Sequence, residues 1–399
     1  MGKIDELIQQ YCPDGVEFHK IKDVYKRIKG TPITATKMKE IANPAGSVRI
    51  FAGGKTVIDA NEEDIPNANI TRVPAVLVQS RGVIDVVYYE QPFTFKNEMW
   101  AYTTENKTSV KYLYYVMKSN VQTFRDAASG MGALPQISLG TTEDFEIPLP
   151  PLPVQKEIVR ILDNFTNLAA ELQAELQARQ QQYQYYRDSL LSLDGRDDVQ
   201  WKEYTLGELG NVVRGNGLQK KDFTETGVGC IHYGQIYTKY GSFTDKTFTY
   251  VDEDLASHLL QVEKGNLVIA CTSENVEDIC KCVAWLGEEN ICTGGHSCVY
   301  RHNQTPKYMA YFFQTDNFFK QKKKYVYGTK VKDIKPTDIE KIIIPLPSLE
   351  EQERIVSILD NLYNLVNDLS QGLPAEIEAR QQQYEYYRDR LLTFNRKEA

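Results

Sequence analysis

Two stretches of the chain carry a heptad pattern, in which apolar side chains recur at alternating steps of four and three residues. This pattern is typical of long helices that pack lengthwise on a partner helix, because the apolar positions form one seam. The stretches lie within residues 148–194 and 345–399. The seam positions that we assign to helix pairing are Ile158, Leu162, Phe165, Leu172, Tyr183, Tyr186, Ile355, Leu359, Leu362, Leu369, Tyr384 and Tyr387.

The two heptad stretches are copies of each other. PLPPLPVQKEIVRILDNFTNL, from Pro148, returns as PLPSLEEQERIVSILDNLYNL from Pro345, and ARQQQYQYYRDSLL later returns as ARQQQYEYYRDRLL. The offset grows from 197 to 201 residues, so the second copy holds a four-residue stutter. Gly372 and Pro374 lie at the stutter, where we expect a kink or a short break. The matched lengths favour antiparallel pairing of the two helices with each other over membership of a larger bundle.

Two further segments, 1–147 and 195–344, predict globular domains. Short β-rich runs such as AVLVQS and NLVIACT alternate in them with Gly, Asn and Pro, as in α+β domains. The segments begin and end alike, but their middle parts differ almost completely. We therefore expect an α+β protein with two globular α/β domains, two long antiparallel coiled-coil helices and an internal pseudo-two-fold repeat.

Composition narrows the setting of the protein. The 399 residues carry a net charge of −8, which argues weakly against non-specific binding to polyanions, so a nucleic-acid role would need local basic surface. No apolar run approaches the roughly 18 residues of a membrane span. The beginning, MGKIDELIQQ, lacks the apolar segment of a secretory signal, which predicts a cytoplasmic protein.

Catalytic and metal-binding signatures are missing from the sequence. The GGKT at 53–56 lacks the first glycine of a phosphate-binding loop, since position 49 is Arg49, and five histidines leave little room for a catalytic triad. Five of the seven cysteines crowd with His296 into residues 271–298, but without the paired C-x₂-C spacing of zinc sites. We therefore favour buried core cysteines over zinc, and the odd number does not suggest a disulfide framework.

Basic residues gather between positions 20 and 39 and between 320 and 335. Such clusters can pair with phosphates, and neighbouring loops can reach base edges. For any single lysine in them, a solvated surface remains the commoner explanation.

The repeated IPLPPLP…EIVRILD and ARQQQY-x-YYRD-x-LL elements resemble the two conserved regions of type I restriction–modification specificity subunits. The CTSENVEDI…TGGHSC stretch resembles a target-recognition domain of the same family, and the resemblance covers essentially the whole chain. It implies that each globular domain recognises one half of a split double-stranded DNA target, and that the helices form a spacer that sets the gap.

The resemblance also implies partners and cofactors. Two modification subunits, which carry S-adenosylmethionine and methylate adenine, would dock on the helices, and two restriction subunits that use ATP and Mg could join them. The specificity subunit itself would catalyse nothing and hold no cofactor. The expected segments are target-recognition domain 1 (1–147), spacer helix 1 (148–194), target-recognition domain 2 (195–344) and spacer helix 2 (345–399).

In this family the DNA-facing groups lie on loops of the recognition domains. Glycine-bearing turns at 129–132 and 327–330 fall at matching positions of the repeat and would let the backbone approach DNA. His296 fits a structural hydrogen-bonding role equally well. The candidate DNA-binding residues are Lys26, Arg27, Lys55, Arg81, Lys96, Gly130, Lys220, His296, Gly328, Thr329, Lys330 and Lys332.

Three other interpretations stay open on the sequence. A combined methyltransferase–endonuclease would need a cofactor fingerprint and an acidic metal site, neither of which is found. A coiled-coil scaffold or regulator would bind no specific DNA sequence. A system that modifies DNA without restricting it would look the same, because the partner subunits decide that activity.

Overall fold

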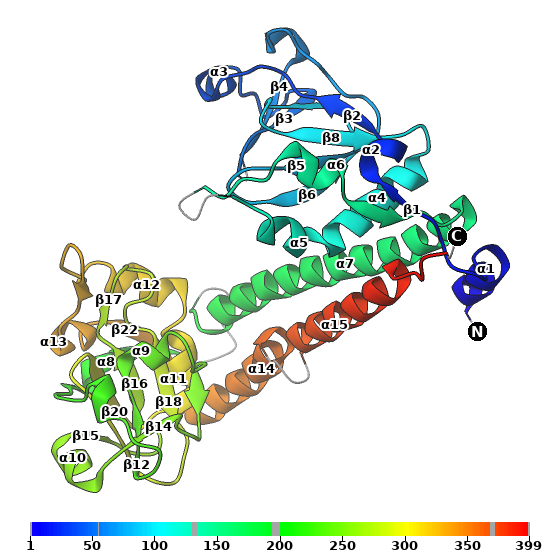
Figure 1. Ribbon diagram of the computed structural model, residues 1–399. Helices are drawn as coiled ribbons and strands as arrows, with labels where there is room; N and C mark the ends of the chain where they lie inside the picture. Colours follow the sequence, from blue (N-terminus) through cyan, green and yellow to red (C-terminus); the bar gives the residue numbers. More distant parts are fainter. Residues whose placement is uncertain (1, 55, 130–133, 194–199, 368–371, 398–399) are drawn as a thin grey trace. The chain divides into compact units, whose positions relative to one another are not determined.

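The computed structural model describes residues 2–54, 56–129, 134–193, 200–367 and 372–397 (Figure 1). The chain separates into two compact units. Unit 1 comprises Met1–Gln173 with Ile377–Ala399, and unit 2 comprises Ala174–Glu376. The described residues do not include Lys55, Gly130 and Leu369, which were assigned roles above. They also do not include the predicted domain boundary between residues 194 and 195.

The globular part of unit 1, here called domain 1, is built on two sheets. Its strands are β2 (Lys26–Lys29), β3 (Val48–Phe51), β4 (Val57–Ala60), β5 (Ala75–Gln79), β6 (Asp85–Tyr89), β7 (Phe93–Phe95) and β8 (Trp100–Thr103). The larger sheet has the order β2-β8-β5-β6 and is antiparallel throughout. The smaller sheet has the order β4-β3-β7, and β3 runs parallel to β7. All five residues of β5 are buried, as in a strand covered on both faces.

Among the described residues, six helices and one 3₁₀ turn accompany the sheets of domain 1. They are α1 (Lys3–Tyr11), α2 (Ile21–Val24), α3 (Ala35–Glu40), α4 (Lys107–Ser119), α5 (Val121–Asp126) and α6 (Leu139–Glu143), with a 3₁₀ turn η1 (Glu62–Asp64). The longest, α4, begins after Asn106, whose side chain accepts hydrogen bonds from the backbone N–H groups of Thr108 and Ser109. Its buried face packs on β5 and β6 and joins the main core of the unit.

The globular part of unit 2, domain 2, contains more strands. They are β11 (Gly210–Arg214), β12 (Val228–Ile231), β13 (Phe243–Thr244), β14 (Thr249–Val251), β15 (Leu260–Val262), β16 (Leu267–Ala270), β17 (Thr272–Ser273), β18 (Cys282–Trp285), β19 (Ile291–Thr293), β20 (Ser297–His302) and β21 (Lys332–Asp333). The helical segments are α8 (Leu206–Leu209), η2 (Lys220–Asp222), α9 (Tyr233–Ile236), α10 (Glu253–His258), α11 (Pro306–Phe312), α12 (Asp316–Lys322) and α13 (Pro336–Ile339).

The two domains share one architecture despite their different sequences. In domain 2 the sheets have the orders β11-β20-β16-β18-β13 and β14-β12-β19-β15. The first four strands of the former repeat the order β2-β8-β5-β6, and β14-β12-β19 repeats β4-β3-β7 with its parallel pair. Strands β13 and β15 are additions at the sheet edges. The expected α+β class and internal repeat are confirmed, and the repeat extends to the middle parts that the sequences did not align.

Each domain is closed at its base by its own first and last strands. In domain 1, β1 (Phe18–Lys20) pairs antiparallel with β9 (Glu146–Pro148). In domain 2, β10 (Lys202–Thr205) pairs in the same way with β22 (Ile343–Leu346). The similar beginnings and endings of the two sequence segments are therefore partners in a sheet.

The heptad stretches form three helices: α7 (Leu152–Leu190), α14 (Leu349–Asn367) and α15 (Leu373–Leu392). Gly372 lies in a bend immediately before α15, so the predicted interruption of the second repeat is present. Within unit 1, Phe165 of α7 packs on α15, and within unit 2, Tyr183 of α7 packs on Tyr363 of α14. Earlier residues of α7 thus meet later residues of the second repeat, as expected for antiparallel pairing.

Candidate nucleic-acid interface

Several loops of domain 1 meet at one edge of its larger sheet. Trp100, at the start of β8, lies between two neighbouring strands. It pairs with Lys29 at the end of β2 on one side and with Val78 near the end of β5 on the other. The end of β5 also meets the start of β6, where Gln79 pairs with Asp85. The loops that follow β2 and β5 and precede β6 and β8 therefore leave the sheet together.

Backbone hydrogen bonds join these loops to each other. The N–H of Gly54, after β3, donates to the carbonyl oxygen of Arg81 at 3.3 Å, and the N–H of Gly82 donates to that of Pro135 at 2.8 Å. Gly54 and Gly82 have φ angles of +72° and +76°, a conformation that other residues rarely adopt. The described residues nearest to Lys55 and Gly130 thus belong to this same cluster of loops.

The basic side chains of domain 1 differ in how they are paired. Arg81 is exposed and forms no ion pair with any residue that the structure describes, whereas the ammonium of Lys96 lies 3.0 Å from a carboxylate oxygen of Glu98. Lys26 and Arg27 stand at the other end of β2, and the guanidinium of Arg27 approaches Glu143 at 3.5 Å. The structure therefore gathers Arg81 and Lys96 but not Lys26 and Arg27 at the loop edge.

In domain 2 the corresponding edge carries a hairpin at residues 327–333. Tyr327 and Asp333 exchange backbone hydrogen bonds of 3.1 and 2.9 Å. Gly328 has a φ angle of +96°, and a Cβ atom there would lie 2.1 Å from the carbonyl oxygen of Val331. Only glycine fits this turn without moving the backbone.

The tip of this hairpin presents the candidate residues of the second domain. Gly328, Thr329 and Lys330 are exposed, while Lys332 is half-buried and its Nζ donates to the carbonyl oxygen of Gly328 at 2.8 Å. Lys330 forms no ion pair with a described residue, so its charge faces solvent. An exposed ammonium on a rigid turn can pair with a DNA phosphate.

A bidentate ion pair anchors the hairpin. The guanidinium nitrogens of Arg214, at the end of β11, donate to both carboxylate oxygens of Asp333 at 2.9 and 2.8 Å. Asp333 thereby raises the pKa of Arg214, and Arg214 also donates to the carbonyl oxygen of Gly295 at 3.3 Å. Arg214 therefore ties the hairpin to the loop that precedes β20, and its charge is neutralised there.

His296 and Lys220 lie on neighbouring loops. His296 is exposed, and its Nδ1 lies 3.1 Å from the hydroxyl of Thr272, while its ring packs 4.8 Å from that of Tyr233. Burial, and then electrostatic interactions with Lys220 and with the His296 ring, lower the pKa of His232 below its usual value. Lys220, His296 and the hairpin are therefore on the same side of domain 2.

The seam residues divide between pairing and anchoring. Ile158 and Leu162 are buried in the core of domain 1, and Ile355 and Leu359 are buried in the core of domain 2. The ring of Phe165 packs against two seam tyrosines, with its centroid 5.4 Å from that of Tyr387 and 6.4 Å from that of Tyr384. Tyr183 is buried in unit 2.

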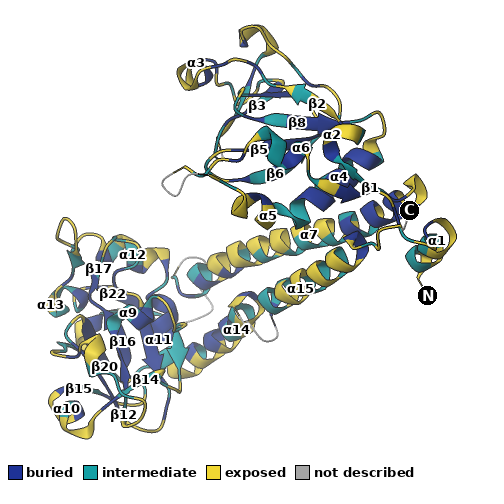
Figure 2. Cartoon of the chain, in the orientation of Figure 1, coloured by how far each residue is buried: buried dark blue, intermediate teal, exposed yellow. Residues whose placement is uncertain are grey.

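The remaining seam positions are more open. Leu172 and Leu362 are half-buried, and Tyr186 is 42% exposed. No residue of α7 between Asn164 and Gln182 is buried (Figure 2). The seam thus contributes most of its buried area where the helices meet the globular domains.

A repeated polar contact that we did not predict fixes each domain to its helix. In domain 1 the hydroxyl of Tyr115 donates to Asp163 of α7 at 2.5 Å, and Lys111 lies 2.9 Å from the same carboxylate. In domain 2 the hydroxyl of Tyr311 donates to Asp360 at 2.6 Å, and Lys307 lies 2.6 Å from it. The signal was a Lys-Tyr-x-x-Tyr pattern that recurs at an offset of 196 residues.

The cysteines are core residues, with one difference from the expectation. Cys271, between β16 and β17, and Cys298 of β20 are joined in a disulfide, and the other five cysteines are buried thiols. Burial raises the pKa of Cys280 to about 12 and that of Cys292 to about 12, so neither is a thiolate at neutral pH.

Among the described residues, no group of three or more His, Cys, Asp or Glu is placed to hold a metal ion. A membrane-crossing length of apolar residues is likewise not found in any described helix.

Comparison with known families finds a match to both halves of the chain. The model of the type I restriction modification DNA specificity domain matches residues 13–179 and again 198–379.

Individual relatives agree with this match. The chain is 33% identical to the Escherichia coli type I restriction enzyme EcoR124I/EcoR124II specificity subunit, over 74% of this chain and 73% of that one. It is 30% identical to a Haemophilus influenzae protein named as a type I restriction enzyme specificity subunit, over 93% and 98%. The crystal structure of the S subunit of the type I restriction–modification system from M. genitalium shares the fold, with a TM-score of 0.57, 17% identity and coverage of 95% and 96%.

Proposed function

The chain belongs to the type I restriction–modification DNA specificity family, and we propose that it recognises a bipartite double-stranded DNA target for the modification complex that it joins. In this proposal domain 1 binds one half of the target and domain 2 binds the other. A scaffold without sequence-specific DNA binding is not favoured, because the family model matches both domains.

One observation carries the proposal: the same sheet architecture occurs twice, and in each copy the corresponding loops gather at the same edge. Around these edges stand exposed cations and hydrogen-bonding groups, here represented by Arg81, Lys330 and His296. Cations provide affinity for phosphates, and varied loops on a constant scaffold provide contacts to base edges. Two different loop sets on one scaffold suit a target with two unrelated halves.

The helices have two roles in the proposal. Their pairing sets the number of unread base pairs between the halves, and their surface docks two modification subunits, which two restriction subunits can join. The repeat supports two docking sites, because a partner that recognises one copy meets a similar surface on the other.

Chemistry in this proposal belongs to the partner subunits. They bring S-adenosylmethionine for adenine methylation, and ATP and Mg for restriction, while this chain supplies no catalytic group and no cofactor site.

The proposal is tested by co-expressing the chain with its genomic modification subunit and mapping methylated adenines by long-read sequencing. We expect two short sequence blocks separated by a fixed gap. A chain in which domain 1 alone is replaced by that of another family member is the matched control, and it should change one block only.

Two results would contradict the proposal. Methylation that is absent although both subunits are expressed and associated would argue for a scaffold. A single continuous target block would argue against one block for each domain.

A further inference from the structure

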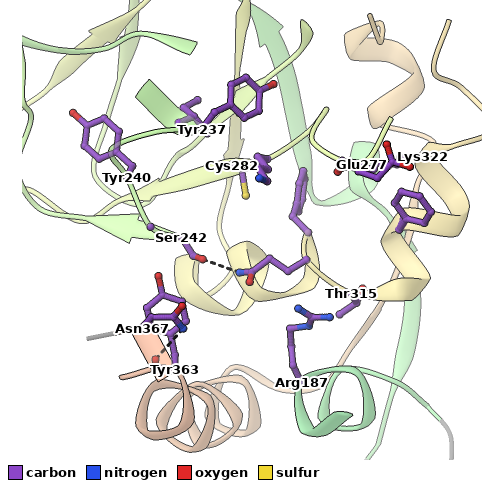
Figure 3. Close-up of a pocket in the computed structure, with 16 residues that line it drawn as sticks. Arg187, Tyr237, Tyr240, Ser242, Glu277, Cys282, Thr315, Lys322, Tyr363 and Asn367 are labelled. Carbon is purple, nitrogen blue, oxygen red and sulfur yellow. Dashed lines mark hydrogen bonds between the residues drawn. The ribbon is translucent and has the colours of Figure 1, made fainter. Parts of the chain in front are cut away.

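Lys322, the last residue of α12, is a buried lysine. It is 4% exposed, and its ammonium donates to the backbone carbonyl oxygens of Glu277, at 3.0 Å, and of Ile279. Figure 3 shows it beside Glu277 on the wall of a cavity of about 390 Å³. Both carbonyls belong to the loop between β17 and β18.

The surroundings of Lys322 do not compensate its charge in the usual way. No carboxylate within ion-pair distance of it is found in the part of the chain that the structure describes, and its nearest aromatic neighbours are the rings of Phe318 and Phe319, at 5.9 and 5.3 Å. Burying an ammonium without a counter-ion is costly, so carbonyl dipoles must supply the compensation. A leucine or methionine would fill this space at lower cost if packing were the only requirement.

The loop that Lys322 holds supports the candidate DNA-binding residues of domain 2. The loop follows directly on β17, which contacts both candidates. The hydroxyl of Thr272 lies 3.1 Å from Nδ1 of His296, and Ser273 pairs with Lys332 of the hairpin. A displacement of residues 272–281 would therefore move both the histidine and the hairpin.

Domain 1 contains a similar contact to a loop carbonyl, made there by an exposed residue. There Arg125 of α5, the helix that corresponds to α12, donates from its Nε to the carbonyl oxygen of Ile84 at 3.0 Å. Ile84 ends the loop 80–84, which contains Arg81. A basic side chain from the second helix thus holds the loop after β5 in domain 1 and after β16 in domain 2, although these sequences are unrelated.

We propose that Lys322 is a positioning residue for target recognition by domain 2, and that Arg125 has the same role in domain 1. Neither side chain needs to touch DNA. Each fixes the loop that carries or supports the contacting residues, so each determines the specificity of one half of the target. The inference rests on the proposed function and assigns residues within it.

The test compares the targets methylated by the complex with single substitutions. Lys322→Met keeps an unbranched apolar stem, one atom shorter than that of lysine, and removes the three donors of the ammonium. We expect methylation at sites with one wrong base in one half to rise about tenfold, because each lost hydrogen bond loosens the loop. Arg125→Met should relax the other half. Lys323→Met, which removes a neighbouring exposed charge, should relax neither.

The outcomes separate the inference from the proposed function. A wild-type complex without a bipartite target refutes the proposed function. A bipartite wild-type target that Lys322→Met leaves unchanged, or relaxes equally in both halves, refutes the inference. If the methionine variant does not assemble, Lys322→Gln retains a donor, and amide hydrogen exchange should rise in residues 272–281 but not in β16. Failure of this variant to assemble would show a general structural role, and unchanged exchange in the loop would show that Lys322 does not hold it; either result overturns the inference.

Discussion

Asp333 of domain 2 and Gln136 of domain 1 occupy corresponding positions, directly before Ile334 and Ile137. Asp333 is held by two hydrogen bonds from Arg214, which a glutamine cannot accept in the same bidentate way. The backbone bonds at this point are the same, since Ile137 donates to the carbonyl of Ser80 at 3.0 Å and Ile334 to that of Cys271 at 3.3 Å. Backbone groups are present in every sequence, so they can preserve a scaffold while side chains change. At this point of the fold, a side-chain anchor is what distinguishes domain 2 from domain 1.

The largest expected difference concerns the glycines of the two loop edges. Gly328→Ala places a Cβ atom 2.1 Å from a backbone oxygen, whereas at Gly82 the nearest atom is a flexible leucine side chain at 3.7 Å. We expect Gly328→Ala to lower the free energy of unfolding by about 3 kcal/mol, because the hairpin must open. Gly82→Ala should cost only about 1 kcal/mol of backbone strain. Urea unfolding measures both, and equal losses would contradict the comparison.

The next effect comes from the anchor of the hairpin. Arg214→Gln leaves the half-buried carboxylate of Asp333 without its partner, and we expect a loss of about 2 kcal/mol in the free energy of unfolding. The added change Asp333→Asn removes the unpaired charge and should recover part of the lost free energy of unfolding. Target mapping should show relaxed recognition in one half only. If the double variant is no more stable than the single one, the ion pair is not the anchor.

A smaller and symmetric effect is expected where each domain meets its helix. Tyr115→Phe and Tyr311→Phe each remove one hydroxyl bond to an aspartate that keeps a lysine partner. We expect each to lower the free energy of unfolding by about 1.5 kcal/mol. Tyr386→Phe, at a 62% exposed tyrosine, serves as the control and should change it by less than about 0.5 kcal/mol. A loss in one domain only would show that the contacts are not equivalent.

The smallest change in stability, and a defined change in binding, is expected at the exposed cations. Arg81→Ala and Lys330→Ala should leave the free energy of unfolding within about 0.5 kcal/mol of the wild type. If each side chain pairs with one phosphate, the slope of log affinity against log salt should fall by about 0.9 for each. DNA binding by the assembled complex, titrated at several salt concentrations, measures this slope. Unchanged slopes in both variants would remove these residues from the interface.

Much of the architecture could be predicted because the repeat is local in the sequence. The similar segments around Ile158 and Ile355 revealed the duplication, and their heptad spacing indicated long helices and their interruption near Gly372. These properties depend on residues within a few turns of each other, so a single sequence displays them.

The correspondence between the middle parts of the two domains could not be predicted, because it depends on pairing between distant strands. The parallel pairs β3–β7 and β12–β19 join segments with no common pattern, and Lys322 meets Ile279 across 43 residues. The link from Tyr311 to Asp360 was open to detection, because Lys-Tyr-x-x-Tyr recurs at nearly the helix offset.

The closing strands of each domain have a consequence for how such proteins can change over generations. Because β1 lies beside β9 and β10 beside β22, the chain leaves each domain about 5 Å from where it entered. A segment whose ends lie together can be replaced as a unit without disturbing what it is attached to. The near-identical sequences that follow each domain offer homologous DNA for recombination. One exchange between genes could therefore deliver a whole new recognition domain, already joined to a helix that fits.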